Sequence, residues 1–366
     1  MNTTHHSDRA AAAHPQEDDN DIETLSWLVT RFAAKEIAPH VTDWDRAGEF
    51  PRGLYARAAQ LGLLGLGYPE DLGGTPASQR MRNAMSQALA RHGASGGVFA
   101  GLFSHNIGLP PLLRHGTDAL QREIVPAVLR GEKIAALAIT EPGGGSDVAA
   151  LRTTARLEGD HYVINGEKTF ITSGMRADFY TVAVRTGGPG PAGVSLLLIE
   201  KGMPGFTQTP LSKMGWLCSD TATLHFDDVR VPVDNLVGTE NQGFKAIMQN
   251  FNRERIFLAA GANGFAQVCL DEALAWAKQR EMFGGKLIDQ QVTRHKLADM
   301  AMRIEATQAM LETLAWRVEH GDAPVGGKLR GDMGATAVEL IGPGETAGSY
   351  MEYEIQDGGY ATIGFR

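Results

Sequence analysis

The amino-acid sequence predicts an α+β protein of several domains, in which a helical domain, a β domain and a second helical domain follow one another. Apolar residues recur every three or four positions in the first third of the chain and again after Asn241, as expected of helices that pack along one face. Between these parts, short segments rich in β-forming residues are linked by turns without crossover helices, which indicates an antiparallel sheet or barrel. The expected divisions are a disordered tail at 1–20, an N-terminal helical domain at 21–133, a middle β domain at 134–240, and an incomplete C-terminal helical bundle at 241–366 that is atypical after about residue 325.

The N-terminal domain is expected to contain several amphipathic helices. The first begins at about Asp21, and Pro39 should end it, because a proline ring does not fit inside a helix. Its apolar stripe consists of Ile22, Leu25, Leu28, Val29 and Phe32. Further helical stretches are predicted at 51–61, 78–92 and 117–130.

The middle domain contains segments typical of strands. Residues 179–185 and 194–199 are dense in β-forming residues, and 221–231 alternates apolar and polar residues. Asn165 and Gly166 are a strong signal for a two-residue hairpin turn.

Two long helices are predicted in the C-terminal domain, from about 243 to 280 and from about 289 to 320. The short segment between them contains two glycines, which suits an antiparallel pair of helices. The apolar stripe of the second helix consists of Leu297, Met300, Ile304, Leu311, Leu314 and Val318.

Composition excludes several classes of function. The chain of 366 residues has a net charge of −9 and no basic cluster, which argues against nucleic-acid or anionic-membrane partners. Cys218 and Cys269 lack metal-type spacing, so we expect two reduced thiols and no metal site. No apolar run is long enough to span a membrane, and the N-terminus lacks the order of a secretory signal, so a cytoplasmic protein is expected.

A glycine loop at residues 140–147 is the first candidate for chemistry. Its three consecutive glycines allow backbone N–H groups to approach an anion closely. It matches neither a Walker loop nor a Rossmann fingerprint, because no lysine follows it and no strand-to-helix unit frames it. From the residues alone, an anion-binding loop and a plain surface turn both remain open.

Four sequence blocks stand out, at 138–147, 165–174, 213–221 and 280–300. In their order and spacing they resemble the signatures of the acyl-CoA dehydrogenase family. The resemblance covers about residues 21 to 322. The resemblance implies an FAD-dependent oxidoreductase of fatty acid metabolism that acts on an acyl-CoA, with an electron-transferring flavoprotein as its electron acceptor.

The resemblance also assigns roles around the flavin ring. Ala138, Ile139 and Thr140 would meet the ring and its N1/O2 edge. Phe170 would pack on the isoalloxazine, and Thr172 would form a hydrogen bond near N5 and O4. Without the resemblance, Phe170 would be a core aromatic residue and Thr172 a plain β-former.

Other family positions lie in the glycine loop and late in the chain. Gly145 would contact the cofactor, and Ser146 would touch the flavin or the pantetheine of the substrate. Arg280, Phe283 and Gln291 are further cofactor positions. Arg280 and Gln291 would reach the FAD of a neighbouring subunit, which implies a dimer or tetramer. Without the resemblance, Arg280 would be a solvated charge at a helix end.

The reaction implied by the resemblance needs a carboxylate, because the α-proton of a thioester is a weak acid that must leave together with the β-hydride. In most of the family this base lies in a late Tyr-Glu-Gly-Thr-like loop, and this sequence has no such loop. A branch that includes long-chain, isovaleryl and citronellyl-type enzymes carries it on the long helix before an arginine. Glu254 matches that position, and Arg255 would orient the carboxylate or the acyl-CoA. The alternative for Glu254 is an ordinary salt-bridged surface residue.

The last forty or so residues do not match the family pattern. Segments 326–331 and 342–348 are rich in glycine, which opposes helix by up to about 1 kcal/mol per residue. A truncated or frame-shifted, non-catalytic relative that binds FAD poorly is therefore an alternative, and a flavin oxidase or monooxygenase is another. The length of the acyl chain stays open.

Overall fold

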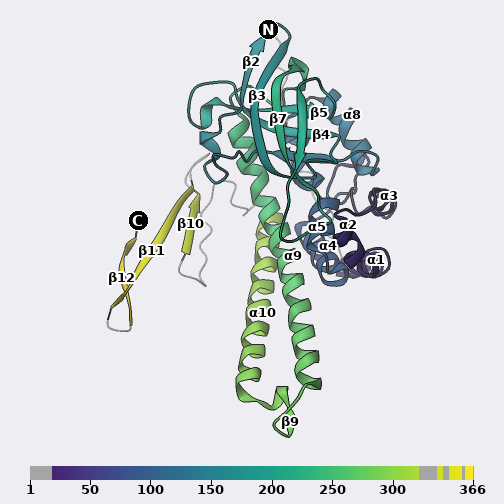
Figure 1. Cartoon of the computed structure of the whole chain (residues 1–366), viewed down its shortest axis with the longest axis vertical. Helices are drawn as coiled ribbons and strands as arrows, with labels where there is room; N and C mark the ends of the chain where they lie inside the picture. Colours follow the sequence, from purple (N-terminus) through teal and green to yellow (C-terminus); the bar gives the residue numbers. More distant parts are fainter. Residues whose placement is uncertain (1–18, 321–335, 341–345, 357–358, 366) are drawn as a thin grey trace.

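The three parts of the chain follow the predicted α–β–α order in the computed structural model (Figure 1), which describes residues 19–320, 336–340, 346–356 and 359–365. Residues 1–18 of the expected tail lie outside the described residues, as do the glycine-rich residues 326–331 and 342–345. No helix within the described ranges is both long and apolar enough to cross a membrane.

Eight helices precede the sheet in the described part of the chain. They are α1 (Asp19–Glu36), α2 (Val41–Ala47), α3 (Gly53–Gln60), α4 (Gln79–Gly93), α5 (Gly96–Leu102), α6 (His105–Gly108), α7 (Pro110–His115) and α8 (Asp118–Leu129). The stripe predicted for the first helix is confirmed at Leu25, Val29 and Phe32, which are all buried. Helices α5 to α7 were not predicted, because glycine and proline pairs interrupt their sequence pattern.

The middle part is a seven-stranded sheet in the order β1-β4-β2-β3-β7-β6, with β5 paired to β4. Its strands are β1 (Ala135–Ala138), β2 (Thr154–Glu158), β3 (His161–Thr172), β4 (Phe179–Arg185), β5 (Val194–Glu200), β6 (Phe206–Pro210) and β7 (Thr221–Pro232). Most pairs are antiparallel, as predicted, but β1 and β2 run parallel to β4. Figure 1 shows the sheet curling above the N-terminal helices.

The predicted hairpin turn at Asn165 and Gly166 is wrong, because β3 continues through both residues. The Asn165 side chain is held by Asp228, which accepts from Asn165 Nδ2 at 2.9 Å and donates its backbone N–H to Asn165 Oδ1 at 3.0 Å. Gly166 has a φ of 142°, and a Cβ there would lie 2.7 Å from the Cα of Thr153. The glycine therefore serves close packing at a bulge in the strand.

Two long helices, α9 (Gly243–Gln279) and α10 (Gln291–Glu319), confirm the prediction for the C-terminal part. A short β-hairpin of β8 (Glu281–Met282) and β9 (Gly285–Lys286) joins the two helices. We call α9, this connection and α10 the helical hairpin, and Figure 1 shows it projecting beyond the rest of the molecule. The last described segments are three antiparallel strands, β10 (Thr336–Leu340), β11 (Thr346–Gln356) and β12 (Gly359–Phe365), which pair with one another.

Short 3-10 helices complete the description. They are η1 (Ala38–His40), η2 (Glu70–Leu72), η3 (Val148–Ala150), η4 (Pro191–Gly193), η5 (Val233–Asn235) and η6 (Leu287–Asp289).

Two apolar clusters hold the N-terminal helices against the sheet. The first contains Phe32, Leu102 and Tyr180, and so joins α1 and α5 to β4. The second contains Ile124, Leu196 and Ile247, and so joins α8, β5 and the start of α9. Because the clusters are shared between parts, the sheet edge and the first half of α9 have defined positions against the N-terminal helices.

Candidate active site

The start of β1 and the end of β3 meet the turn between α5 and α6 at one buried residue, Ser104. Its hydroxyl donates to the carbonyl oxygen of Ala135 at 3.0 Å and accepts from the Ser173 hydroxyl at 3.0 Å. Ser104 and Ser173 are 2% and 0% exposed, so these hydrogen bonds are protected from water. They join the start of β1 to the end of β3, the strand that carries Phe170 and Thr172.

At the end of β1, Ala138 and Ile139 are buried and Thr140 is partly exposed. The carbonyl of Thr140 accepts from the Thr169 N–H at 2.8 Å, which ties this segment to β3. Among the residues that the structure describes, the N–H of Thr140 has no hydrogen-bond acceptor. A donor of this kind at a partly exposed position is available to a ligand.

At the end of β3, Phe170 has a φ of 58° and is 70% exposed. A bulky residue in left-handed backbone, with its ring in solvent, is costly and is found mainly at functional sites. This excludes the alternative of a core aromatic residue. Two positions further on, Thr172 is partly exposed, and its hydroxyl makes no hydrogen bond within the described segments.

The glycine loop is a tight turn in which Glu141 and Gly144 exchange both backbone hydrogen bonds, at 3.1 and 3.0 Å. Gly145 and Ser146 are exposed, and a Cβ at Gly145 would lie 3.1 Å from the Thr140 side chain. An open groove of about 680 Å³ begins next to the loop. It is lined by Asp147, residues 149–152, Arg185 and residues 187–190.

Glu254 lies on α9, on the face that packs against the N-terminal helices. One turn before it, Asn250 Nδ2 donates to the Ile107 carbonyl at 2.9 Å. One turn after it, Phe257 stacks on Phe99 with 5.3 Å between ring centroids. Residues at this spacing share a helix face, so Glu254 also faces α5 and α6.

The environment of the Glu254 carboxyl group is apolar. Its Oε2 is buried and has no hydrogen-bond partner within the described part of the chain. Burial raises the pKa of Glu254 to about 6, against the opposing effect of Arg255. Arg255 is exposed, and its guanidinium lies 5.7 Å from the centre of the Phe251 ring. The carboxyl group is therefore poised to exchange a proton near neutral pH.

A buried ion pair behind the glycine loop was missed by the sequence analysis. Lys168 Nζ donates to Glu141 Oε1 at 2.8 Å and to the Ile139 carbonyl at 3.0 Å. Glu141 also accepts from the backbone N–H groups of Arg152 and Thr153, at 2.6 and 2.8 Å. Both residues stand in the family blocks at 138–147 and 165–174, but sequence spacing could not show that they pair.

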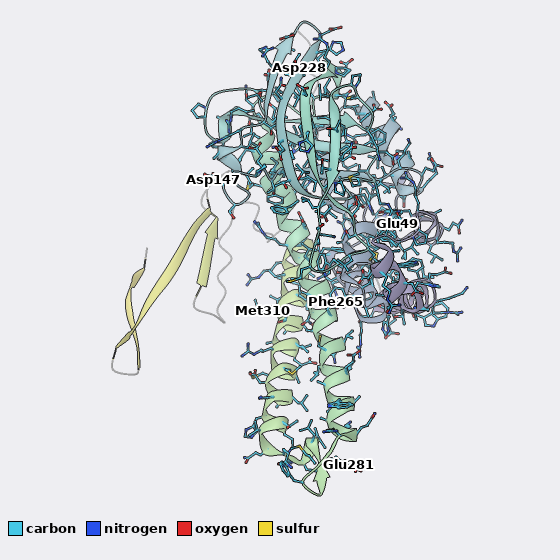
Figure 2. The ribbon with its side chains drawn as sticks, viewed as in Figure 1. Glu49, Asp147, Asp228, Phe265, Glu281 and Met310 are labelled. Atoms are coloured by element: carbon cyan, nitrogen blue, oxygen red, sulfur yellow. The ribbon has the colours of Figure 1, made fainter. Side chains whose placement is uncertain are left out.

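Arg280, Phe283 and Gln291 do not join this site within one chain. Arg280 caps the far end of α9, 26 positions after Glu254, which corresponds to about 39 Å along the helix axis. Phe283 is 92% exposed and Gln291 is exposed as well. Figure 2 shows Glu281, their neighbour, at the tip of the helical hairpin and far from Asp147 of the glycine loop.

The surface formed by Thr140, just after β1, and by Phe170 and Thr172, near the end of β3, fits a flavin ring. It offers the unpartnered N–H of Thr140, the hydroxyl of Thr172 and the exposed ring of Phe170. A flat heteroaromatic ring with acceptors along its edge needs such donors and such an apolar surface. Together with a carboxyl group of raised pKa on a neighbouring helix, these features are those expected of a flavoprotein oxidoreductase.

Comparison with known proteins gives the family. Three domain descriptions match the chain in order: "Acyl-CoA dehydrogenase, N-terminal domain" at 19–132, "middle domain" at 136–229 and "C-terminal domain" at 241–337. The chain therefore belongs to the acyl-CoA dehydrogenase family, whose members are FAD-dependent flavoproteins. Residues 338–366 lie outside these matches, so the family pattern ends somewhat later than the predicted 325.

Individual relatives agree with this assignment. The mitochondrial isobutyryl-CoA dehydrogenase of Bos taurus is 39% identical over 285 residues, which cover 78% of this chain and 68% of that protein. The mitochondrial long-chain specific acyl-CoA dehydrogenase of Mus musculus is 35% identical over 289 residues, or 78% of this chain and 67% of that protein. A crystal structure of a probable acyl CoA dehydrogenase from Mycobacterium abscessus is 49% identical, with a TM-score of 0.81 and coverage of 83% of this chain and 81% of that chain.

Proposed function

We propose that this chain oxidises an acyl-CoA thioester to the trans-2-enoyl-CoA, with Glu254 as the base that removes the α-proton. The observation that carries the proposal is the Glu254 carboxyl group, whose buried Oε2 lacks a partner within the described residues. A carboxylate without partners is the stronger base, and it is free to accept a proton from a bound substrate.

The position of Glu254 supports this role. Contacts of Asn250 and Phe257 with the N-terminal helices hold the helix on either side of it. The side chain is therefore presented from a rigid element, which limits the orientations that the carboxyl group can adopt. Arg255 follows immediately and opposes the effect of burial, and with a pKa of about 6 the Glu254 carboxyl group is mainly ionised at pH 7.

We propose that FAD binds at the ends of β1 and β3. Ala138, Ile139 and Thr140 would lie along the ring edge, with the Thr140 N–H as donor. Phe170 would cover the ring face, and the Thr172 hydroxyl would donate near N5. When bound, FAD supplies the acceptor for the β-hydride. The Thr140 N–H and the Thr172 hydroxyl would stabilise negative charge on the bound ring.

The polar end of acyl-CoA would lie along the groove beside the glycine loop. Asp147 of the glycine loop lines the groove, and the exposed Gly145 and Ser146 directly precede it in the chain. Arg185 is fully engaged with backbone carbonyls, among them Leu151 and Ala149 at 2.8 and 2.7 Å. Arg152 also lines the groove, is exposed, and makes no side-chain ion pair with the described residues, so it can bind a phosphate group.

The test is an anaerobic titration of the purified protein with butyryl-, isobutyryl- and palmitoyl-CoA, followed by the visible flavin spectrum. The wild-type flavin band should bleach with at least one of these substrates. Glu254→Gln should retain the band and lose bleaching, whereas Glu272→Gln, an exposed glutamate on the same helix, should behave as wild type.

Other outcomes would redirect the proposal. If the Glu254→Gln variant bleaches as fully as wild type, another residue is the base. A colourless protein that takes up no added FAD would support the non-catalytic alternative. Rapid reoxidation in air would point to an oxidase. If the dehydrogenase is confirmed, reduction of an added electron-transferring flavoprotein tests the proposed electron acceptor.

A further inference from the structure

We propose that Lys168 tunes the bound flavin through the peptide group between Ile139 and Thr140. Its buried ammonium group polarises this peptide, so that the Thr140 N–H becomes a stronger donor and favours the reduced form of the flavin. The inference rests on the proposed binding of FAD at Thr140 and makes Lys168 a positioning residue rather than a catalytic one.

The geometry of one peptide unit carries the inference. Lys168 Nζ donates to the Ile139 carbonyl oxygen at 3.0 Å. That carbonyl and the N–H of Thr140 belong to the same peptide group, and the N–H has no acceptor among the described residues. A charged donor on the oxygen of an amide withdraws electron density from its nitrogen, which makes the N–H more acidic.

The surroundings preserve this effect. Lys168 is 0% exposed, so water does not screen the interaction. Burial lowers the pKa of Lys168 to about 8, but Glu141 opposes that shift, and the side chain stays mainly protonated at pH 7. Hydrogen bonds in such a medium reinforce one another by an estimated 10–30% per bond.

Glu141 positions the lysine and is itself firmly held. Besides Lys168, it accepts from the N–H groups of Arg152 and Thr153. Burying a lysine costs free energy, and replacing a buried ion pair by apolar groups is often neutral or stabilising. Fold stability alone is therefore a weak reason for this pair, whereas the contact with the Ile139 carbonyl directs its charge at the flavin edge.

The sign follows from the charge of the ring. Reduction places negative charge along the N1/O2 edge, so a stronger donor there stabilises the reduced form more than the oxidised one. Loss of the Lys168 ammonium group should therefore lower the reduction potential of the bound flavin. A purely structural role for Lys168 would instead weaken the binding of both forms equally.

The experiment measures the midpoint potential of bound FAD in the holoenzyme, by reductive titration with a reference dye. Lys168→Met should shift the balance between reduced and oxidised flavin about tenfold towards the oxidised form, or about 30 mV for a two-electron couple. The matched control is Lys201→Met. Lys201 Nζ also donates to a backbone carbonyl, that of Met175 at 2.6 Å, but on an exposed strand end. This variant should leave the potential unchanged.

A second variant guards against misfolding. Lys168→Met leaves Glu141 buried with two backbone donors, and if it fails to fold, the double variant Lys168→Met/Glu141→Gln removes both charges and should show the same shift. If the folded Lys168→Met or double variant has the same flavin midpoint potential as Lys201→Met, the inference is overturned. If the potential is unchanged but acyl-CoA still bleaches the flavin, only the inference about Lys168 fails and the proposed function stands. A wild-type protein that binds no flavin would contradict the proposed function and the inference together.

Discussion

Glu254 and Lys168 are both ionisable side chains in apolar surroundings, but their charges are satisfied differently. Lys168 has a carboxylate and a carbonyl acceptor at 2.8 and 3.0 Å. Glu254 has a buried oxygen without a partner in the described chain. A satisfied charge organises the residues around it, whereas an unsatisfied one is reactive and costs stability. The two residues thus suit two different tasks, orientation and proton transfer.

The first prediction concerns pH. Because burial raises the pKa of Glu254 to about 6, the base is protonated in acid and ionised above that pH. The rate constant for flavin reduction at low acyl-CoA concentration should rise about tenfold per pH unit below about 6 and level off above it. Stopped-flow measurements from pH 5 to 8 check this. A profile without a break near pH 6 would argue against Glu254.

The second prediction concerns stability. The folded pKa of Glu254, about 6, exceeds its ordinary 4.5, so the folded state binds more protons between these values, and stability falls as pH rises through them. The full penalty, present above about pH 6, is at most about 2 kcal/mol, and partial exposure reduces it to about 1 kcal/mol. Glu254→Gln should therefore unfold at higher temperature than wild type at pH 8 but not at pH 4. A lower midpoint at pH 8 would contradict it.

At the scale of elements, β3 is fixed along its length by distant partners, whereas α9 is held in its first half by contacts with the N-terminal helices. β3 pairs with β2 on one side and β7 on the other, and its bulges aim individual residues. One register shift falls at Gly166, and another falls between Lys168 and Ile171, where Phe170 turns outward. The strand therefore buries Lys168 and exposes Phe170 two residues later.

The third prediction tests this packing at Gly166. A Cβ at this position would lie 2.7 Å from the Cα of Thr153, and the φ of 142° is unfavourable for any other residue. Gly166→Ala should lower the free energy of unfolding by about 1–3 kcal/mol. Gly53→Ala is the control, because a Cβ there meets nothing within 4 Å. Thermal unfolding of the two variants should separate them clearly, and equal midpoints would refute the close approach.

At the scale of the whole molecule, the helical hairpin separates two groups of predicted cofactor residues. Arg280 lies about 39 Å of helix beyond Glu254, and Phe283 and Gln291 follow it in the connection between α9 and α10 and at the start of α10. Large apolar side chains along the hairpin are also exposed, including Trp276 and Met302 at 60% and 62%. A second copy of the chain would both cover these side chains and bring the tip of the hairpin to a neighbouring site.

The fourth prediction uses this separation. If Arg280 serves a neighbour's flavin, subunits carrying Glu254→Gln and subunits carrying Arg280→Glu should complement each other when co-expressed. Each site would use Glu254 of its own subunit and Arg280 of the neighbour. In a hybrid dimer one site therefore carries both substitutions and the other carries neither, so about half of the sites should be active. Sequential purification by two different tags, followed by acyl-CoA reduction assays, measures this. Hybrids no more active than the parent variants would place Arg280 outside the neighbour's site.

The sequence by itself determined most helices and strands, because their patterns are local. The periodicity of α1, α9 and α10 and the β-forming runs of β4, β5 and β7 were interpreted correctly. The family resemblance also singled out Glu254 as a candidate, by its place before Arg255 on a long helix, and its role as the base stays a prediction. Short helices between glycines and prolines were missed, because their stability comes from packing rather than from their own pattern.

Only the tertiary structure decided how residues distant in sequence combine. It showed that Asn165 pairs with Asp228, 63 positions later, and that the expected turn is therefore a strand. It also paired Lys168 with Glu141 and left the Glu254 carboxyl group without a partner in the described chain. The physical reason is that burial and hydrogen bonding across elements, which set a pKa or direct a charge, arise only when separate segments pack together.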